Sequence, residues 1–132
     1  MDFKELGSTG VKLPEIGLGT WNYKGGVEPF RKAIELGAYL IDTAELYENQ
    51  SGSETMLGEV LSQPAPDGKP LRDGVFLASK VLPQHATARG VPAACKDSLV
   101  RLQTDRLDLY YHHWRGPTPL EETMRALADL VD

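Results

Sequence analysis

Apolar residues along the chain gather in short continuous runs that alternate with longer stretches of helical spacing. Continuous apolar runs, without the polar alternation of a half-exposed sheet, are typical of parallel strands covered on both faces. Four such runs predict strands, and a stretch of helical spacing follows each of them. The predicted strands are 16–21, 38–42, 75–80 and 107–114, and the predicted helices are 29–37, 53–61, 92–102 and 120–131.

Residues at the ends of these helices support the assignment. Pro29 suits the first turn of the first helix, and Gly37 suits its C-terminal stop. Ser53 is a possible N-cap of the second helix, and Glu54 is expected to favour its first turn or to lie in solvent. Residues 64–73 are rich in Pro, Gly and Asp, which predicts an exposed loop.

The segment before the first strand differs from the rest. Residues 3–15 predict a hairpin of two short strands around Gly7 and Gly10, because glycine permits the positive φ of a tight turn. The repeated β-α order after the hairpin implies parallel strands joined by right-handed helical crossovers, which is an α/β fold. Gly17 and Gly19 lack the third glycine of a dinucleotide-binding loop, so a Rossmann fold has weak support.

Composition narrows the class of protein. The chain has 132 residues, 41% of them apolar and 25% charged, with a formal net charge of −5, which suits one globular domain. A negative charge without a basic cluster argues against a nucleic-acid binder, and no apolar run approaches the ~20 residues of a membrane-spanning helix. The N-terminus carries no apolar signal region, and the single Cys95 cannot form an internal disulfide. A cytoplasmic protein, with Cys95 buried among apolar groups, is therefore expected.

Residues capable of chemistry stand at the ends of three predicted strands. Asp42 ends the second strand, Lys80 ends the third, and His113 lies near the end of the fourth. In a parallel barrel the C-terminal ends of the strands meet at one rim, so these side chains are expected to lie together. Tyr47, five residues after Asp42, is placed on the loop that follows the second strand.

Together these four groups suit the donation of a proton to a carbonyl oxygen. A free tyrosine has a pKa of about 10, and a nearby ammonium stabilises the phenolate. An aspartate holds the ammonium in position, and an imidazole can hydrogen-bond the carbonyl oxygen. Singly, Asp42 could be a turn or N-cap residue, Tyr47 a packing residue and Lys80 a solvated charge. Their joint spacing is what indicates a function.

With these residues in place, the sequence resembles the aldo-keto reductase family. The matching stretches occur in the family's order, cover nearly all of the chain, and include an Ile-Asp-Thr-Ala-x-x-Tyr element followed by the later Lys and His. The likeness is greatest to bacterial reductases of small aldehydes and α-dicarbonyls. The matching stretches are 6–10, 16–21, 40–47, 75–80 and 107–114.

The resemblance implies NADPH-dependent reduction of an aldehyde or ketone to an alcohol. Tyr47 would be the general acid, Lys80 would stabilise its phenolate, Asp42 would pair with Lys80, and His113 would position the carbonyl. His112 competes for the last role, but successive strand residues face opposite sides. The family's His stands beside a Trp or Pro, which favours His113. His112 is then expected between strand and helix.

The resemblance also implies which residues meet the ligands. Gly19, Thr20 and Trp21 would lie near the nicotinamide end of NADPH, and Asp42 would also touch the cofactor. Trp21 and Trp114 would wall the substrate pocket beside the two reacting side chains, Tyr47 and His113. No metal-binding residues are expected, and His85 is placed in a loop.

The family fold is a TIM barrel of eight βα units, whereas this sequence carries the hairpin and about four units. Residues 1–132 are therefore expected to form a single incomplete domain, the N-terminal half of a truncated barrel. In full-length members the groups that hold the nicotinamide amide and the phosphates follow the fifth and later strands. Most of the cofactor-binding residues are thus expected to be absent from this chain.

Three hypotheses remain open from the sequence. The first is an oxidoreductase that uses NADPH and a small carbonyl substrate. The second is a non-catalytic remnant or a self-associating module, in which two copies would close a ring as a homo-oligomer. The third is an unrelated α/β binding protein whose four polar residues coincide by chance.

Overall fold

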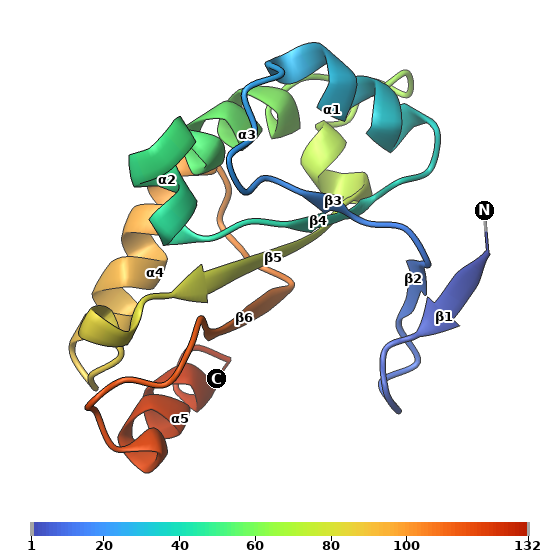
Figure 1. The fold of residues 1–132 in the computed structure, drawn as a ribbon. Helices are drawn as coiled ribbons and strands as arrows, with labels where there is room; N and C mark the ends of the chain where they lie inside the picture. Colours follow the sequence, from blue (N-terminus) through green and yellow to red (C-terminus); the bar gives the residue numbers. More distant parts are fainter. Residues whose placement is uncertain (1, 132) are drawn as a thin grey trace.

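The computed structural model describes residues 2–131 and contains two sheets. The small sheet is an antiparallel hairpin, as predicted. The larger sheet has four parallel strands in sequence order, which is the predicted half of a barrel (Figure 1). The hairpin strands are β1 (Phe3–Glu5) and β2 (Lys12–Pro14), and the parallel strands are β3 (Leu18–Gly19), β4 (Leu40–Asp42), β5 (Phe76–Val81) and β6 (Leu109–His112).

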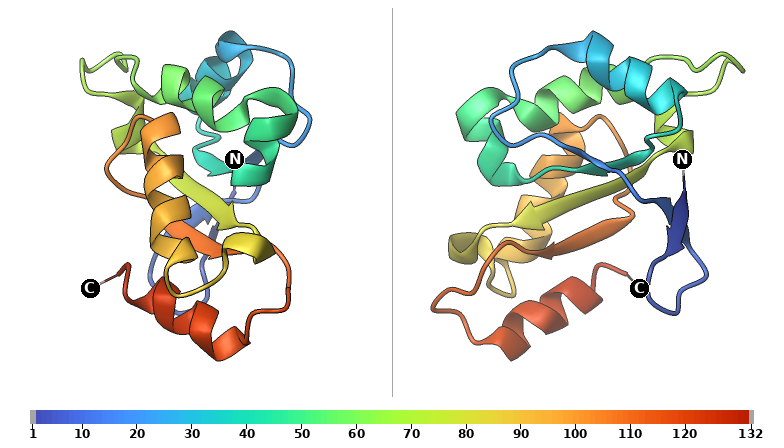
Figure 2. Two further views of the ribbon diagram at one scale, coloured as in Figure 1. Left: turned by 90° about the vertical axis from the view of Figure 1, so that its left-hand side faces the viewer. Right: turned by 45° about the vertical axis from the view of Figure 1, so that its right-hand side comes forward.

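The α-helices form an arc outside the curved sheet, and the hairpin lies near the N-terminal ends of the strands (Figures 1 and 2). Four of the five helices match predicted ones, with ends that differ by at most three residues, and α3 matches at both ends. Two short 3₁₀ turns flank β5. The α-helices are α1 (Val27–Glu35), α2 (Glu45–Ser51), α3 (Ser53–Leu61), α4 (Gly90–Arg101) and α5 (Leu120–Ala128), and the turns are η1 (Leu71–Gly74) and η2 (Pro83–His85).

The main core lies between the sheet and helices α1 and α3. Ile41 of β4 and Leu77 of β5 are completely buried there, against Leu57 and Leu61 of α3. A second, smaller cluster joins the end of β5 to α4 and α5 through Val81, Val91, Ala94 and Ala126. Apolar burial of about 25 cal/mol per Å² therefore acts mostly on the outer face of the sheet.

Among residues 2–131, no helix covers the inner face of the sheet (Figures 1 and 2). A cavity of about 350 Å³ lies there, between the hairpin and the strands. Leu6 and Leu13 line it from the hairpin side, and Leu18, Phe76 and Leu109 line it from three strands. This apolar hollow corresponds to the interior of the half barrel.

The sequence did not predict helix α2. Residues 45–51 contain few apolar residues and show no stripe along one face, so periodicity alone indicated a loop. Gly52 takes a left-handed conformation (φ 65°) and separates α2 from α3. Tyr47 consequently stands on a helix, and its assignment to a loop was wrong.

Two further local predictions were wrong near α3. Gly52, rather than Ser53, is the N-cap, and the Ser53 hydroxyl donates a hydrogen bond to the carbonyl oxygen of Thr20. Glu54 is not solvated but completely buried. Its carboxylate accepts hydrogen bonds from Ser79 Oγ and Arg101 Nε, each at 2.7 Å. A charge can stay buried when it is paired and hydrogen-bonded in this way.

The predicted exposed loop, 64–73, is mostly exposed, Asp73 included, but not throughout its length. Leu71 and Arg72 are buried. Arg72 donates to the carbonyl of Val75 and to the carboxylate of Asp108, each at 2.8 Å. Burial lowers the pKa of Arg72, and the charge of Asp108 opposes that shift. Within residues 2–131, no helix is long and apolar enough to cross a membrane.

Candidate active site

The C-terminal ends of three neighbouring strands bring the predicted acid, amine and imidazole to one rim. Gly19 pairs with Asp42 between β3 and β4, and Lys80 pairs with Tyr111 between β5 and β6. Lys80 Nζ donates to Asp42 Oδ2 at 2.6 Å and to the carbonyl oxygen of Thr43 at 2.8 Å. The lysine is 6% exposed, so these two bonds fix a largely buried ammonium.

Tyr47 reaches this ion pair from the first turn of α2. Lys80 Nζ lies 5.0 Å from the centre of the Tyr47 ring, within the range of a cation–π contact. The Tyr47 and His113 rings meet edge to face, with centroids 5.6 Å apart at 86°. The structure therefore brings Tyr47, Lys80, Asp42 and His113 into one contact network, as their spacing predicted.

The surroundings of His113 favour a neutral ring. Burial lowers the pKa of His113, and the positive charge of Lys80 lowers it further. Asp42 and Glu45 act in the opposite direction with smaller effects. Its Nδ1 is buried and has no hydrogen-bond partner among residues 2–131. A neutral imidazole keeps one N–H to donate and one nitrogen to accept a hydrogen bond.

Tyr111 belongs to the same network, although it was not among the predicted site residues. Its hydroxyl donates to Asp42 Oδ1 at 2.7 Å, and its ring centre lies 5.4 Å from Lys80 Nζ. Burial raises the pKa of Tyr111, and its hydrogen bond to Asp42 raises it further. The available signal was the strand period of two, which places Tyr111 on the same side of the strand as His113.

The residues predicted beside the cofactor occupy different environments. Gly19 is exposed at the end of β3, and a side chain added there would meet no neighbouring atom. Thr20 is completely buried, and its hydroxyl donates to Thr43 Oγ1 at 2.8 Å. Thr20 thus links the segment after β3 to the segment after β4 beneath the surface of the rim. Trp21, by contrast, is 69% exposed.

The remaining aromatic and histidine residues are placed as follows. Trp114 is 50% exposed, and its ring packs against His113 at 4.5 Å between centroids. His112 ends β6, and its Nε2 is buried without a hydrogen-bond partner in the described part of the chain. His85 lies in η2, where its Nδ1 is 3.0 Å from the carboxylate of Glu45. The pairing of His85 with Glu45 was not expected.

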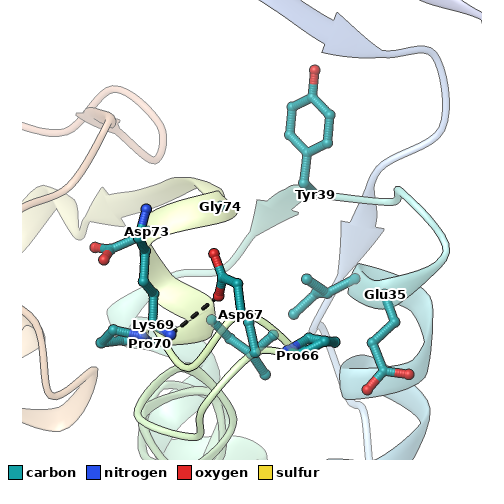
Figure 3. A pocket seen from close by; sticks show the side chains of 11 residues that line it. Glu35, Tyr39, Pro66, Asp67, Lys69, Pro70, Asp73 and Gly74 are labelled. Carbon is teal, nitrogen blue, oxygen red and sulfur yellow. Dashed lines mark hydrogen bonds between the residues drawn. The ribbon is translucent and has the colours of Figure 1, made fainter.

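A second hollow lies well away from this network. It has a volume of about 460 Å³ and lies between the end of α1 and the segment before η1 (Figure 3). Glu35, Tyr39 and Lys69 are among its lining residues, and the amide of Lys69 donates to Asp67 at 3.1 Å. None of the four clustered side chains lines it.

Comparison with known proteins agrees with this geometry. The model of the aldo/keto reductase family matches residues 15–132. Methylglyoxal reductase YeaE of Escherichia coli is 44% identical over 128 residues, which cover 92% of this chain and 42% of that protein.

Solved structures show the same likeness. The thermostable aldo-keto reductase Tm1743, solved with the inhibitor epalrestat, superimposes with a TM-score of 0.85 at 38% identity, over 99% of this chain and 50% of its own. An aldo/keto reductase from Klebsiella pneumoniae, solved with NADP and acetate, gives a TM-score of 0.80 at 44% identity, over 91% of this chain and 42% of its own.

The chain spans about half the length of the proteins it matches. Its parallel half-barrel is that of the TIM-barrel reductases among those structures. The match of the family model over most of the chain, together with these identities, shows that the chain belongs to the aldo-keto reductase family.

Proposed function

We propose that this chain carries the proton-donating part of a carbonyl reductase site. The reaction is the NADPH-dependent reduction of an aldehyde or ketone to an alcohol. One observation carries the proposal: at the C-terminal rim of the sheet the Tyr47 ring lies against Lys80, which is paired with Asp42, and against the His113 ring. Reactive groups gather at this rim in barrel enzymes.

The proposed mechanism assigns one task to each side chain. His113, kept neutral by burial and by Lys80, donates a hydrogen bond to the substrate's carbonyl oxygen and orients it. NADPH, when bound, supplies the hydride that adds to the carbonyl carbon. Tyr47 gives its proton to the same oxygen, and the alcohol leaves. Lys80 stabilises the resulting phenolate until solvent restores its proton.

Asp42 keeps the ammonium of Lys80 in place for this task. One carboxylate oxygen accepts from Lys80 at 2.6 Å and the other from Tyr111 at 2.7 Å. With both oxygens engaged, the carboxylate has little freedom to rotate away from the amine. This arrangement agrees with the preorganised electrostatics that reduce the cost of charge developing during a reaction.

The residues present fit the nicotinamide end of the cofactor. Open space at Gly19 lets a flat ring approach the backbone. Trp21 follows Gly19 by two residues, Trp114 directly follows His113, and both indoles are exposed. We assign Gly19, Thr20, Trp21 and Asp42 to this end, with Thr20 acting indirectly, because the whole residue is buried and its hydroxyl bonds Thr43. The remaining cofactor contacts are assigned to the part of the relatives that this chain does not cover.

The substrate class follows from the relatives and from the exposed aromatic residues. YeaE is named a methylglyoxal reductase, so we propose a small aldehyde or α-dicarbonyl as substrate. Trp21 and Trp114 are exposed, and we propose that they wall the pocket beside Tyr47 and His113. We further propose a cytoplasmic location, which agrees with the buried free thiol of Cys95.

The test is NADPH binding followed by turnover with methylglyoxal. Binding is measured by the change in nicotinamide fluorescence, and turnover by the loss of NADPH absorbance. Tyr47→Phe is expected to lower turnover by ~10²–10⁴-fold, because it removes the general acid, while leaving NADPH binding unchanged. If folded protein at millimolar concentration leaves the nicotinamide fluorescence unaltered, catalysis by this chain alone is refuted.

The open sheet favours a second candidate, a self-associating half-barrel without turnover. Strands β3 and β6 are the edges of the sheet, and an apolar cavity lies on its inner face. Unpaired edges invite pairing with another chain. Two copies joined by a twofold axis would complete a ring of parallel strands. Light scattering that shows a compact, stable monomer would refute this candidate.

A further inference from the structure

Glu45 makes contacts that the mechanism above does not use. It is the first residue of α2, yet it is only 7% exposed. Its carboxylate turns away from its own helix and accepts the backbone N–H of Leu82, just beyond β5. The same carboxylate meets Nδ1 of His85, in η2, at 3.0 Å and 3.1 Å.

These contacts join the two segments that bear the proposed acid and its ammonium partner. Glu45 stands two residues before Tyr47, and Leu82 stands two residues after Lys80. The Glu45–Leu82 hydrogen bond is therefore a short cross-link between α2 and β5, close to the point where the Tyr47 ring contacts Lys80.

Helix α2 needs such a cross-link to hold its place. It has seven residues, its N-cap is Ala44, and no side chain caps its first turn. A helix this short is marginal by itself, so tertiary contacts must fix its position. On its other side, Glu48 accepts hydrogen bonds from the amide and the hydroxyl of Thr55, which ties α2 to α3. Glu45 provides the corresponding tie towards the site.

Because Glu45 is buried, its carboxylate depends on its hydrogen bonds to Leu82 and His85. A carboxylate at the start of a helix is favoured by the helix dipole even when it stays in water. Removing it from water carries a penalty that the Leu82 amide and His85 offset. Without Glu45, the Leu82 N–H loses its acceptor, which favours a rearrangement of this junction.

We propose that Glu45 is a positioning residue, which holds Tyr47 against Lys80 and His113 through its bonds to Leu82 and His85. The effect of Glu45 on catalysis rests on the function proposed above, whereas its effect on the position of Tyr47 does not. The charge of Glu45 also acts on His113. Glu45 lies close enough to raise the pKa of His113, against burial and Lys80, which lower it.

The His113 ring reports on both effects. It meets the Tyr47 ring edge to face, so its NMR signals carry the ring current of Tyr47. The charged groups that face His113 are Lys80 of β5, Asp42 of β4 and Glu45 of α2. Loss of Glu45 alone should therefore shift the ring resonances of His113 and lower its pKa further.

The experiment uses the full chain with ¹³C-labelled histidine, which has three ring signals because the sequence contains three histidines. Signals are assigned with His112→Gln and His113→Gln, and the remaining signal belongs to His85. In Glu45→Ala we expect displaced His113 resonances and a titration midpoint lowered by about half a pH unit. Glu45→Gln should give a smaller displacement, because its amide oxygen can still accept from Leu82.

Glu48→Gln is the matched control. It removes one negative charge from the same helix, its amide oxygen can still accept from Thr55, and no bond to Leu82 or His85 is changed. Its His113 signals should equal those of the unaltered protein. If Glu45→Ala unfolds, His85→Ala replaces it, because the His85 side chain is 49% exposed and its loss is better tolerated. That variant should displace the His113 resonances in the same direction.

The outcomes separate this proposal from the proposed function. Turnover of methylglyoxal should fall about tenfold in Glu45→Ala, with kcat changing more than KM. If the unaltered protein shows no turnover, the proposed function fails, while the NMR result still decides the role of Glu45. Unchanged His113 resonances in folded Glu45→Ala, or in folded His85→Ala, would overturn the positioning role.

Discussion

Two ion pairs in this protein have nearly the same geometry but very different surroundings. Arg101 lies 2.7 Å from Glu54, and Lys80 lies 2.6 Å from Asp42. The Glu54 side chain is completely buried, whereas that of Asp42 is 42% exposed. The Glu54 carboxylate is also bonded to Ser79, so it joins α3, α4 and β5 inside the outer layer.

The second pair differs because its carboxylate remains accessible, which agrees with the catalytic role proposed above. Phenol rings flank it on two sides, with Tyr47 at 5.0 Å and Tyr111 at 5.4 Å from the ammonium. A charge pair enclosed among structural partners stabilises the fold, and its removal leaves a buried charge unpaired. A pair at an open rim contributes less to stability but can transmit its charge to a substrate. The following changes test that difference.

The largest loss of stability is expected from Glu54→Ala. It removes the partner of Arg101 and Ser79 in a buried position, so the free energy of unfolding should fall by ~3–5 kcal/mol. Urea denaturation followed by circular dichroism measures this loss. Glu59→Ala, at an exposed position of the same helix, should change stability by less than ~0.5 kcal/mol. Equal losses in both variants would contradict the distinction.

A smaller loss is expected from Lys80→Met at the open pair. The apolar side chain can occupy the buried position, and Asp42 is exposed enough to be hydrated. The free energy of unfolding should fall by only about 1 kcal/mol, measured by the same denaturation. Turnover, in contrast, should fall by ~10²–10⁴-fold. A stability loss as large as that of Glu54→Ala would show that the rim pair is mainly structural.

Tyr111→Phe should have a still smaller effect on stability. It removes one hydrogen bond to the partly exposed Asp42, which is expected to lower the free energy of unfolding by about 0.5–1 kcal/mol. Tyr39→Phe is the matched control, since its hydroxyl donates to the carbonyl of Lys12 at the surface at 2.8 Å, close to the 2.7 Å of the Tyr111 bond. Comparable denaturation midpoints for the two variants would argue against a special role for the Tyr111 bond.

The smallest expected effect is on the pH dependence of stability. Because the pKa of His113 is lowered in the folded protein, the unfolded chain binds this proton first as the pH falls. Stability is then full above the unfolded value of about 6.5 and declines as the pH falls through the folded pKa. Thermal melting at successive pH values should show a shallower decline in His113→Gln. An identical decline in both proteins would exclude this contribution.

Much of the architecture was predictable because it depends on local patterns. Continuous apolar runs and helical spacing identified the four strands and four of the α-helices, since these periods follow from backbone geometry alone. The same patterns placed Asp42, Lys80 and His113 near strand ends. Parallel pairing then brings those ends together, as the network of contacts shows.

The features that the sequence did not predict concern residues whose environment is set by distant parts of the chain. Glu54 reads locally as a solvated residue of a helix's first turn, and only Ser79 and Arg101 make its burial possible. Tyr111 gains its role from the strand register that sets it beside Lys80. Neither relation is present in the residues next to them in sequence.

The amino-acid sequence by itself determined the order of strands and helices and the strand ends that carry Asp42, Lys80 and His113. Only the tertiary structure decided that residues 45–51 form a helix, because contacts such as those of Glu45 with Leu82 and Glu48 with Thr55 stabilise a segment too short and too polar to be helical alone. The placement of Tyr47 depends on that helix. The distance between the phenol and its ammonium partner is thus a property of packing rather than of spacing along the chain.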